Sequence, residues 1–261
     1  MLMVFDIGNT TIGLGLFRGR KLVANWKIKS DREKTADEYG IILCNLLGHE
    51  GLSCQKIKGA IISSVVPPLT PILQTACQIF FKVKPLVVGP GLKTGIPILY
   101  ENPAEVGSDR IVAACAAYEK HGGPCLVVDF GTATTFDAIS GRGEYLGGAI
   151  APGIQISAEA LYLRTARLPR IEVRKPKSAI GRTTVASMQS GLYFGYIGLV
   201  KNIIAEMSAE LESKPRVIAT GGFAELITGE IAEIDFLEPN LVLEGLRLIF
   251  EKNRGTERKR S

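Results

Sequence analysis

The sequence predicts an α/β protein built from two similar halves, each carrying a mixed sheet. Short apolar runs punctuated by glycine alternate with longer segments of helical periodicity, a pattern typical of this class. The second observation is an internal sequence repeat, because VFDIGNTTIGLGLF at residues 4–17 is similar to VVDFGTATTFDAI at residues 127–139. In both segments two apolar residues are followed by Asp, an apolar residue and Gly. Both segments then continue through a threonine-rich turn into another strand-like run.

The internal repeat also predicts the domain organisation. Asp6 and Asp129 are 123 positions apart, close to half of the 261 residues. A repeat at that distance indicates two duplicated domains rather than a short-period solenoid. No low-complexity linker divides the chain. We therefore expect an N-terminal domain over residues 1–118 and a C-terminal domain over 119–261.

The apolar patterns predict the individual elements in order. Strands are expected at residues 2–7, 12–17, 22–27, 59–64, 85–88, 125–130, 134–139, 145–149 and 216–220. Helices are expected at residues 36–48, 69–81, 103–120, 153–163, 184–212, 222–228 and 241–253. The first helix has the clearest start signal, because Thr35 and Glu38 have the spacing of a capping box.

Composition indicates a globular protein of the cytoplasm. Hydrophobic residues make up 46% and charged residues 22% of the chain. No segment approaches the roughly 18 uninterrupted apolar residues of a membrane helix, and the N-terminus lacks the pattern of a secretory signal. The cysteines are odd in number and scattered, which argues against a disulfide framework or a zinc site and favours a reducing compartment. They are Cys44, Cys54, Cys77, Cys115 and Cys125.

The net charge of +5 does not by itself indicate nucleic acid. Much of it lies in the tail EKNRGTERKRS, which begins at Glu251. We interpret this tail as a solvated, frayed terminus rather than a binding arm. Neither a nucleic acid nor a membrane is expected as a partner.

The turn after Asp6 has the composition of a phosphate-binding loop. Gly8 permits a positive φ and a close backbone approach, and Asn9 and Thr10 add polar groups beside exposed amides. The pattern is neither a P-loop nor a dinucleotide fingerprint. The aspartate before each turn would then hold a cation beside the phosphates. A plain hairpin turn is the alternative for either copy alone, and the occurrence of two copies favours phosphate binding.

A third loop comes late in the chain, where Thr220, Gly221 and Gly222 separate a strand from a helix. Two glycines there would let the backbone lie against a flat ring, and we interpret the loop as a site for the adenosine part of a nucleotide. A simple strand-to-helix turn is the alternative.

The segment YENPAEVGSDR, which begins at Tyr100, predicts the acceptor side of a transfer reaction. Asn102 and Pro103 suit the start of a helix that Gly122 and Gly123 would end.

Gly107 is unusual inside that expected helix, because glycine costs about 1 kcal/mol there relative to alanine. A glycine would let another group approach the helix closely. Asp109 could serve as the general base for a hydroxyl that attacks a γ-phosphate, and Arg110 could bind a carboxylate or phosphate through two hydrogen bonds. A surface ion pair between these two residues is the alternative.

A further polar cluster precedes the longest expected helix. Either Thr183 or Thr184 could cap that helix. Gly191, Gly195 and Gly198 lie close to one helical face, which indicates close packing in the core or at a subunit interface.

Taken in order, these motifs resemble the type III pantothenate kinases, bacterial enzymes that phosphorylate pantothenate in the first step of coenzyme A synthesis. The resemblance covers nearly the full length. Its motifs are DIGNTTIGLGLF at 6–17, ISSVVPPL at 62–69, GSDR at 107–110, DFGTATTFD at 129–137, GGAIAPG at 147–153, GRTT at 181–184, TGG at 220–222 and EPNLVLEGL at 238–246.

The resemblance implies a fold and a nucleotide site. The family belongs to the acetate and sugar kinase, heat-shock chaperone and actin superfamily, so we expect two duplicated ribonuclease-H-like (actin-like ATPase) domains with mixed five-stranded sheets flanked by helices. It implies that ATP is bound by Asp6, Ile7, Gly8, Asn9, Thr10, Thr11, Ile12, Gly13 and Thr132. It also implies a monovalent cation at Asp129, K⁺ or NH₄⁺, and Mg²⁺ near Asp6.

The resemblance also implies the acceptor site and the assembly. The pantothenate residues are Tyr100, Gly107, Ser108, Asp109, Arg110 and Thr184, with Asp109 as proton acceptor. The sequence departs from the family's commoner pattern at Ser108, where alanine is more frequent, and at Thr183, where asparagine is common. Members of the family are usually homodimers, so we expect a homodimer here.

Two other functions are weighed against this interpretation. A sugar or acetate kinase of the same superfamily would need an acceptor site rich in Asn, Asp and Glu, whereas the expected helix offers an arginine among apolar residues. A non-enzymatic regulator on the same scaffold would be expected to lack Asp109 or a loop aspartate, and the chain keeps Asp6, Asp109 and Asp129.

Overall fold

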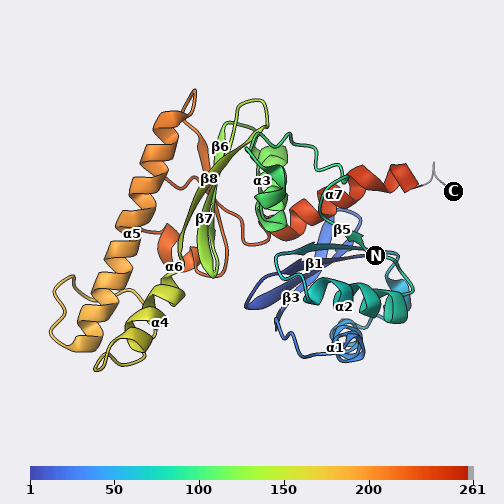
Figure 1. The fold of residues 1–261 in the computed structure, drawn as a ribbon, viewed down its shortest axis with the longest axis horizontal. Coiled ribbons are helices and arrows are strands. Elements are labelled where there is room, and N and C mark those ends of the chain that lie inside the picture. The colour runs from blue at the N-terminus through green and yellow to red at the C-terminus, as the bar shows by residue number, and fades with distance from the viewer. Residues whose placement is uncertain (258–261) are drawn as a thin grey trace. The chain divides into compact units, whose positions relative to one another are not determined.

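The computed structural model of the chain describes residues 1–257. The chain divides into two compact units (Figure 1). Unit 1 comprises Met1–Ile96, Glu101–Ala116 and the chain from Leu241 onward, and unit 2 comprises Pro97–Tyr100 and Ala117–Asn240.

The units differ from the predicted ranges 1–118 and 119–261 in three places: Pro97–Tyr100 belong to unit 2, the boundary falls after Ala116 rather than after residue 118, and the last helix belongs to unit 1. Helix α7 (Leu241–Glu257) packs on the first, second and fourth strands, all of which belong to unit 1. Its apolar face therefore completes the first core. Sequence order alone assigns this helix to the second half.

Unit 1 contains a mixed five-stranded sheet. Its strands are β1 (Leu2–Ile7), β2 (Thr11–Arg18), β3 (Lys21–Lys29), β4 (Gly59–Ser64) and β5 (Leu86–Val87). Their order is β3-β2-β1-β4-β5, with β1, β2 and β3 antiparallel and with β4 and β5 parallel to β1. Because β1 lies at the centre of the sheet, its side chains are buried up to Asp6, which is only partly buried.

Unit 2 repeats this sheet. Its strands are β6 (Cys125–Phe130), β7 (Ala133–Ile139), β8 (Tyr145–Pro152), β9 (Arg216–Thr220) and β10 (Phe236–Leu237). The order of these strands is β10-β9-β6-β7-β8. Read in the opposite direction, it equals that of unit 1, because β6 pairs antiparallel with β7 and parallel with β9, as β1 does with β2 and β4. The duplication and the mixed five-stranded sheets are confirmed. Strand β10 was not predicted.

The helices begin and end close to their expected positions, with three exceptions, one of which is α7, which ends at Glu257 rather than at residue 253. They are α1 (Ala36–His49), α2 (Leu69–Ala76), α3 (Ser108–His121), α4 (Ile154–Arg164), α5 (Thr184–Glu210), α6 (Ala224–Thr228) and α7. The helix predicted at 69–81 ends at Ala76 and continues as a π-helical turn, Cys77–Phe81. The helix predicted at 103–120 divides into a 3₁₀ turn, Pro103–Glu105, and α3.

Each unit has its own core. In unit 1, α1 and α2 bury Leu43, Leu47 and Leu73 beside Phe5 and Ile62 of the sheet. In unit 2, α4 and α5 pack on β7 (Figure 1). Burying one such leucine contributes about 1.5–3 kcal/mol, so the two cores supply the main stabilisation of the two sheets.

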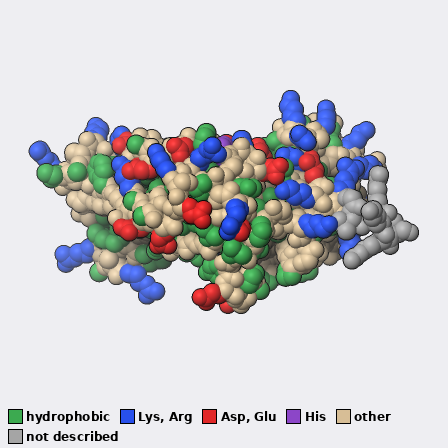
Figure 2. Space-filling view, turned by 90° about the horizontal axis from the view of Figure 1, so that it is seen from above, with side chains coloured by type: hydrophobic (Ala, Val, Ile, Leu, Met, Phe, Trp, Pro, Cys, Tyr) green, Lys and Arg blue, Asp and Glu red, His purple; other side chains and the backbone are tan. Residues whose placement is uncertain are grey.

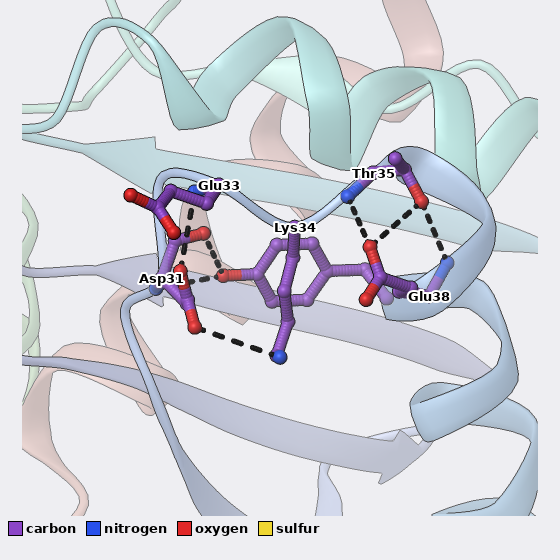
Figure 3. A network of polar contacts seen from close by, with 6 residues as sticks. Asp31, Glu33, Lys34, Thr35 and Glu38 are labelled. Atoms are coloured by element: carbon purple, nitrogen blue, oxygen red, sulfur yellow. Dashed lines mark hydrogen bonds and ion pairs between the residues drawn. The ribbon is translucent and has the colours of Figure 1, made fainter.

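The start of α1 confirms the predicted capping box. The Oγ1 atom of Thr35 accepts a hydrogen bond from the Glu38 amide at 3.3 Å, and the Glu38 carboxylate accepts one from the Thr35 amide at 2.8 Å. Beside it, the Tyr39 hydroxyl donates to the Asp31 carbonyl and accepts from the Asp31 amide, both at 2.9 Å (Figure 3). The segment that leads into α1 is therefore fixed to the helix.

One prediction about cysteine is wrong. Cys44 of α1 and Cys54 form a disulfide across a separation of 10 residues, although the scattered cysteines had argued against any such bridge. The two residues come together because the chain reverses at the end of α1, a turn that cysteine spacing does not reveal. The thiols of Cys77, Cys115 and Cys125 are buried and form no disulfide.

The charged residues lie mainly on the surface. In the face shown in Figure 2, Lys and Arg side chains are interspersed with Asp and Glu over much of the area. The tail predicted to fray from Glu251 is helical as far as Glu257, because α7 extends past the predicted end at 253. The rest of the tail lies outside the described residues. Among helices within residues 1–257, none has both the length and the apolar character needed to cross a membrane.

Candidate active site

The first predicted phosphate loop is a tight turn between β1 and β2. The Gly8 amide donates to the Thr11 carbonyl at 3.0 Å, and a side chain at Gly8 would bring its Cβ within 3.1 Å of the same oxygen. Asn9, Thr10 and Thr11 are exposed. The turn therefore presents its polar groups to solvent, as an anion-binding loop requires.

The loop after β3 holds this turn in place. The Ser30 amide donates to the Thr10 carbonyl at 3.0 Å, and the Ser30 hydroxyl donates to the Gly8 carbonyl at 2.5 Å. A guanidinium nitrogen of Arg32 lies 3.4 Å from the Asn9 side-chain oxygen. Since this segment is itself fixed to α1 through Tyr39 (Figure 3), the turn is anchored to the core of unit 1.

Asp6 lies beside this turn on β1. It is paired with Gly13 on β2 and with Ser63 on β4. Gly13 has no side chain to cover its neighbour, and a Cβ there would lie 3.7 Å from that of Asp6. The carboxylate is consequently only partly buried.

The second loop has the same position in unit 2, between β6 and β7. Phe130 pairs with Thr134, and Gly131 and Thr132 form the turn between the two strands. Thr132 is exposed, whereas Thr134 is buried and its hydroxyl contacts the Tyr196 hydroxyl of α5. The turn is therefore anchored to a helix, as the first turn is.

Two further glycines close around this second turn. A Cβ on Gly153, which precedes α4, would lie 2.2 Å from the Thr132 carbonyl oxygen. Gly221, which follows β9, has a φ of +99°, and a Cβ there would lie 2.4 Å from an Asp129 carboxylate oxygen. Real side chains do not tolerate such distances. Glycine at both positions is therefore required for the backbone to lie against Asp129 and its turn.

The start of α3 is attached to the carboxyl end of β4. The hydroxyls of Ser108 and Ser63 lie 2.9 Å apart. The Ser108 hydroxyl also accepts a hydrogen bond from the Ser64 amide at 3.0 Å and donates one to the Ser64 carbonyl at 3.2 Å. Because Ser63 pairs with Asp6, β4 joins the first loop to the start of α3 within unit 1.

Sequence reasoning assigned no role to Ser63 or Ser64. The sequence feature that could have indicated their role is the pair of adjacent polar residues at the end of an apolar strand, within ISSVVPPL. A partner for them becomes visible only when α3 is folded onto β4.

Asp109 follows in the first turn of α3. Its Oδ1 atom accepts a hydrogen bond from the Arg110 amide at 2.8 Å. Burial raises the pKa of this carboxyl above its ordinary value, while the Arg110 amide and the Arg110 charge oppose the increase. A carboxylate with a raised pKa is a stronger base, which suits proton abstraction near neutral pH.

The prediction that Gly107 lies inside a helix is wrong. Gly107 precedes α3, and its carbonyl accepts hydrogen bonds from the amides of Arg110 at 3.1 Å and Ile111 at 3.3 Å. It therefore lies immediately before Ser108, the first residue of the helix. What approaches it closely is the Asp109 carboxylate.

The other predicted acceptor residues belong to unit 2. Tyr100 lies against β8, where a Cβ on Gly147 would be 3.4 Å from its ring, and its ring centroid is 6.4 Å from that of Tyr145. Thr184 is the first residue of α5, which is capped by Thr183, whose hydroxyl accepts from the Ala186 amide at 3.1 Å.

Comparison with known proteins shows the family to which the chain belongs. The family model for type III pantothenate kinase matches residues 2–206. A type III pantothenate kinase of Geobacter sulfurreducens is 53% identical over 254 residues, which are 97% of this chain and 100% of the relative.

Two solved structures share the fold. A Baf family transcriptional activator from Campylobacter jejuni has a TM-score of 0.63 at 20% identity, covering 97% of this chain and 99% of its own. The activator of 2-hydroxyisocaproyl-CoA dehydratase from Clostridium difficile, with bound ADPNP, has a TM-score of 0.55 at 14% identity, covering 99% and 97%. These likenesses confirm the expected actin-like ATPase fold.

Proposed function

The chain belongs to the type III pantothenate kinase family, whose members phosphorylate pantothenate in coenzyme A biosynthesis, and we propose which of its residues perform that transfer. The observation that carries the proposal is the start of α3. There a partly buried carboxylate, Asp109, directly follows Ser108, whose hydroxyl is attached to the strand that adjoins Asp6.

ATP is proposed to bind through both turns. In unit 1 the phosphates contact the turn that runs from Asp6 to Gly13, and in unit 2 Thr132 contacts the nucleotide. The exposed polar groups of both turns and their anchoring to the cores support this assignment. Thr220, Gly221 and Gly222 would face the adenosine part.

The carboxylates beside the turns fit metal ions of the hard type. Within the described residues there is no group of three or more His, Cys, Asp or Glu side chains that could hold a metal ion. Single carboxylates beside phosphates are the usual ligands of Mg²⁺ in kinases. We assign Mg²⁺ to Asp6 and a monovalent cation, K⁺ or NH₄⁺, to Asp129. These ions would neutralise phosphate charge.

Pantothenate is assigned to the start of α3 and to two residues of unit 2. Gly107, Ser108 and Arg110 line the acceptor in unit 1, and Tyr100 and Thr184 contribute from unit 2. Arg110 is 9% exposed and suits the acceptor's carboxylate, which a guanidinium can bind through two hydrogen bonds.

Asp109 is the proposed proton acceptor. It removes the proton of the primary hydroxyl as that oxygen bonds to the γ-phosphorus and the bond to the bridging oxygen of ADP breaks. Most of the rate enhancement comes from positioning and charge neutralisation, as in phosphoryl transfer generally.

A homodimer in the cytoplasm is proposed for the intact enzyme. The glycines of α5 (Gly191, Gly195 and Gly198) are exposed, and a Cβ on any of them would meet nothing within 4 Å. No part of the described chain covers this face, which supports an interface with a second copy rather than packing in the core.

A coupled assay of ADP release tests the activity and its ion requirement. With Mg²⁺ and ATP, we expect ADP release that depends on pantothenate and increases when K⁺ replaces Na⁺. Acetate and hexoses should give only the background rate. A lack of pantothenate-dependent ADP with either cation would refute the assignment, and equal rates with a sugar would favour the superfamily's sugar kinases.

A further inference from the structure

Resting on the proposed role of Asp109, we propose that Gly107 and Ser108 are positioning residues that hold the Asp109 carboxylate against the first amides of α3. The three residues are consecutive, but each contributes differently. Gly107 leaves the space that the carboxylate occupies, and Ser108 fixes the start of the helix to β4.

The space at Gly107 is occupied by the base itself. A Cβ at this position would lie 2.5 Å from the Asp109 Oδ1 atom, closer than real Cβ contacts come. The next nearest atom outside Asp109 is a methyl of Val65 at 3.6 Å, an ordinary contact. Gly107 is not among the residues with positive φ, so the backbone itself accepts alanine. An added methyl would therefore act mainly on the carboxylate.

Ser108 fixes the backbone from which Asp109 projects. Its hydroxyl makes three contacts of 2.9–3.2 Å with Ser63 and Ser64 of β4. Ser63 is fully buried, so these bonds exchange little with water. Since Asp109 is the next residue, its position relative to β4 follows from this attachment.

The arrangement affects the protonation of the base. Burial raises the pKa of Asp109, and hydrogen bonds from the backbone amides of Arg110 and Asp109 oppose that increase because they stabilise the ionised form. Arg110 is the charged group that acts on Asp109 in this environment. If the carboxylate leaves these amides, its pKa increases, and less of it is ionised at a given pH.

The Gly107→Ala variant tests this directly. We expect kcat at neutral pH to fall by roughly 10- to 100-fold, because small displacements of a reacting group have effects of this size. We also expect a change in the dependence of kcat on pH: its acidic limb should move to higher pH. The KM for ATP should be unchanged. Damage to the fold alone would not move that limb.

Two variants of Ser108 test the role proposed for this residue. They give a result even if the Gly107→Ala variant does not fold. Ser108→Ala should lower kcat several-fold and move the same limb upward, and Ser108→Thr, which keeps the hydroxyl, should restore both. Ser140→Ala is the matched control, because Ser140 in the β7–β8 hairpin also makes three hydrogen bonds, of 2.8–3.2 Å. The dependence of kcat on pH in this control variant should equal that of the wild type.

The outcomes separate this inference from the proposed function. An unchanged acidic limb in both Gly107→Ala and Ser108→Ala, with Asp109→Asn inactive, would overturn the inference and leave the role of Asp109 intact. A failure of Ser108→Thr to restore the wild-type profile would overturn the part assigned to Ser108. Substantial turnover by Asp109→Asn would instead remove the proposed function on which the inference rests.

Discussion

Replacing Asp109 by asparagine is expected to lower kcat by about 10²–10⁴-fold, the range that general-base catalysis contributes. The amide has nearly the shape of the carboxylate but cannot accept the proton of the attacking hydroxyl. Because Asp109 lies in the first turn of α3, outside both proposed phosphate-binding turns, ATP affinity should not change. Steady-state kinetics and calorimetric titration with ATP measure the two quantities.

Glu105→Gln is the matched control for this change. Glu105 is an exposed carboxylate in the neighbouring 3₁₀ turn, where it accepts a hydrogen bond from the Asn102 amide group at 2.8 Å. Its loss should leave kcat within a factor of two or so of the wild type, since surface substitutions usually have small effects. Near-normal turnover by Asp109→Asn would remove Asp109 from the role of base.

The Gly153→Ala variant is expected to have the second largest effect. Its Cβ would lie 2.2 Å from the Thr132 carbonyl oxygen, and that backbone atom cannot move aside without displacing the second turn. Overpacking of this kind lowers the free energy of unfolding by about 1–3 kcal/mol. We also expect KM for ATP to increase roughly tenfold, because the turn that is proposed to contact the nucleotide moves. Chemical denaturation and steady-state kinetics measure these changes.

A second glycine provides the control for this comparison. Gly48 is exposed near the end of α1, and a Cβ there would meet nothing within 4 Å. Gly48→Ala should therefore stabilise the protein by about 0.5–1 kcal/mol through helix propensity and leave KM for ATP unchanged. If both variants had the same effect on KM, the close packing of α4 on the second turn would not explain it.

The repeat of the two aspartate-containing turns could be predicted because its signal is local. In each copy a buried apolar run, an aspartate, a glycine and a threonine-rich turn occupy consecutive positions. Strand pairing then places Asp6 and Asp129 at equivalent positions, as the two sheets show. Local propensity and tertiary structure agree here.

The acceptor side was predicted less accurately because its geometry depends on contacts distant in sequence. The pattern from Pro103 onward reads as one helix, but the attachment of Ser108 to β4 starts α3 at that residue. Gly107 therefore precedes the helix. The role of Ser63 depends on the same contact, between residues 45 positions apart.

Two other differences have the same origin. Cys44 and Cys54 form a disulfide because the chain reverses after α1, which spacing does not encode. Helix α7 belongs to unit 1 because its apolar face covers β1, β2 and β4, although it follows the last strand of unit 2 in the sequence. In each case tertiary packing decides the outcome.

The most direct test of the whole account is identification of the phosphorylated product. The protein is incubated with ATP, Mg²⁺, K⁺ and pantothenate, and the products are examined by ³¹P NMR and mass spectrometry. We predict one new phosphate monoester on the primary hydroxyl of pantothenate, formed in equal amount to ADP. ADP that accumulates without a phosphorylated acceptor, or phosphate on any other group, would contradict the account.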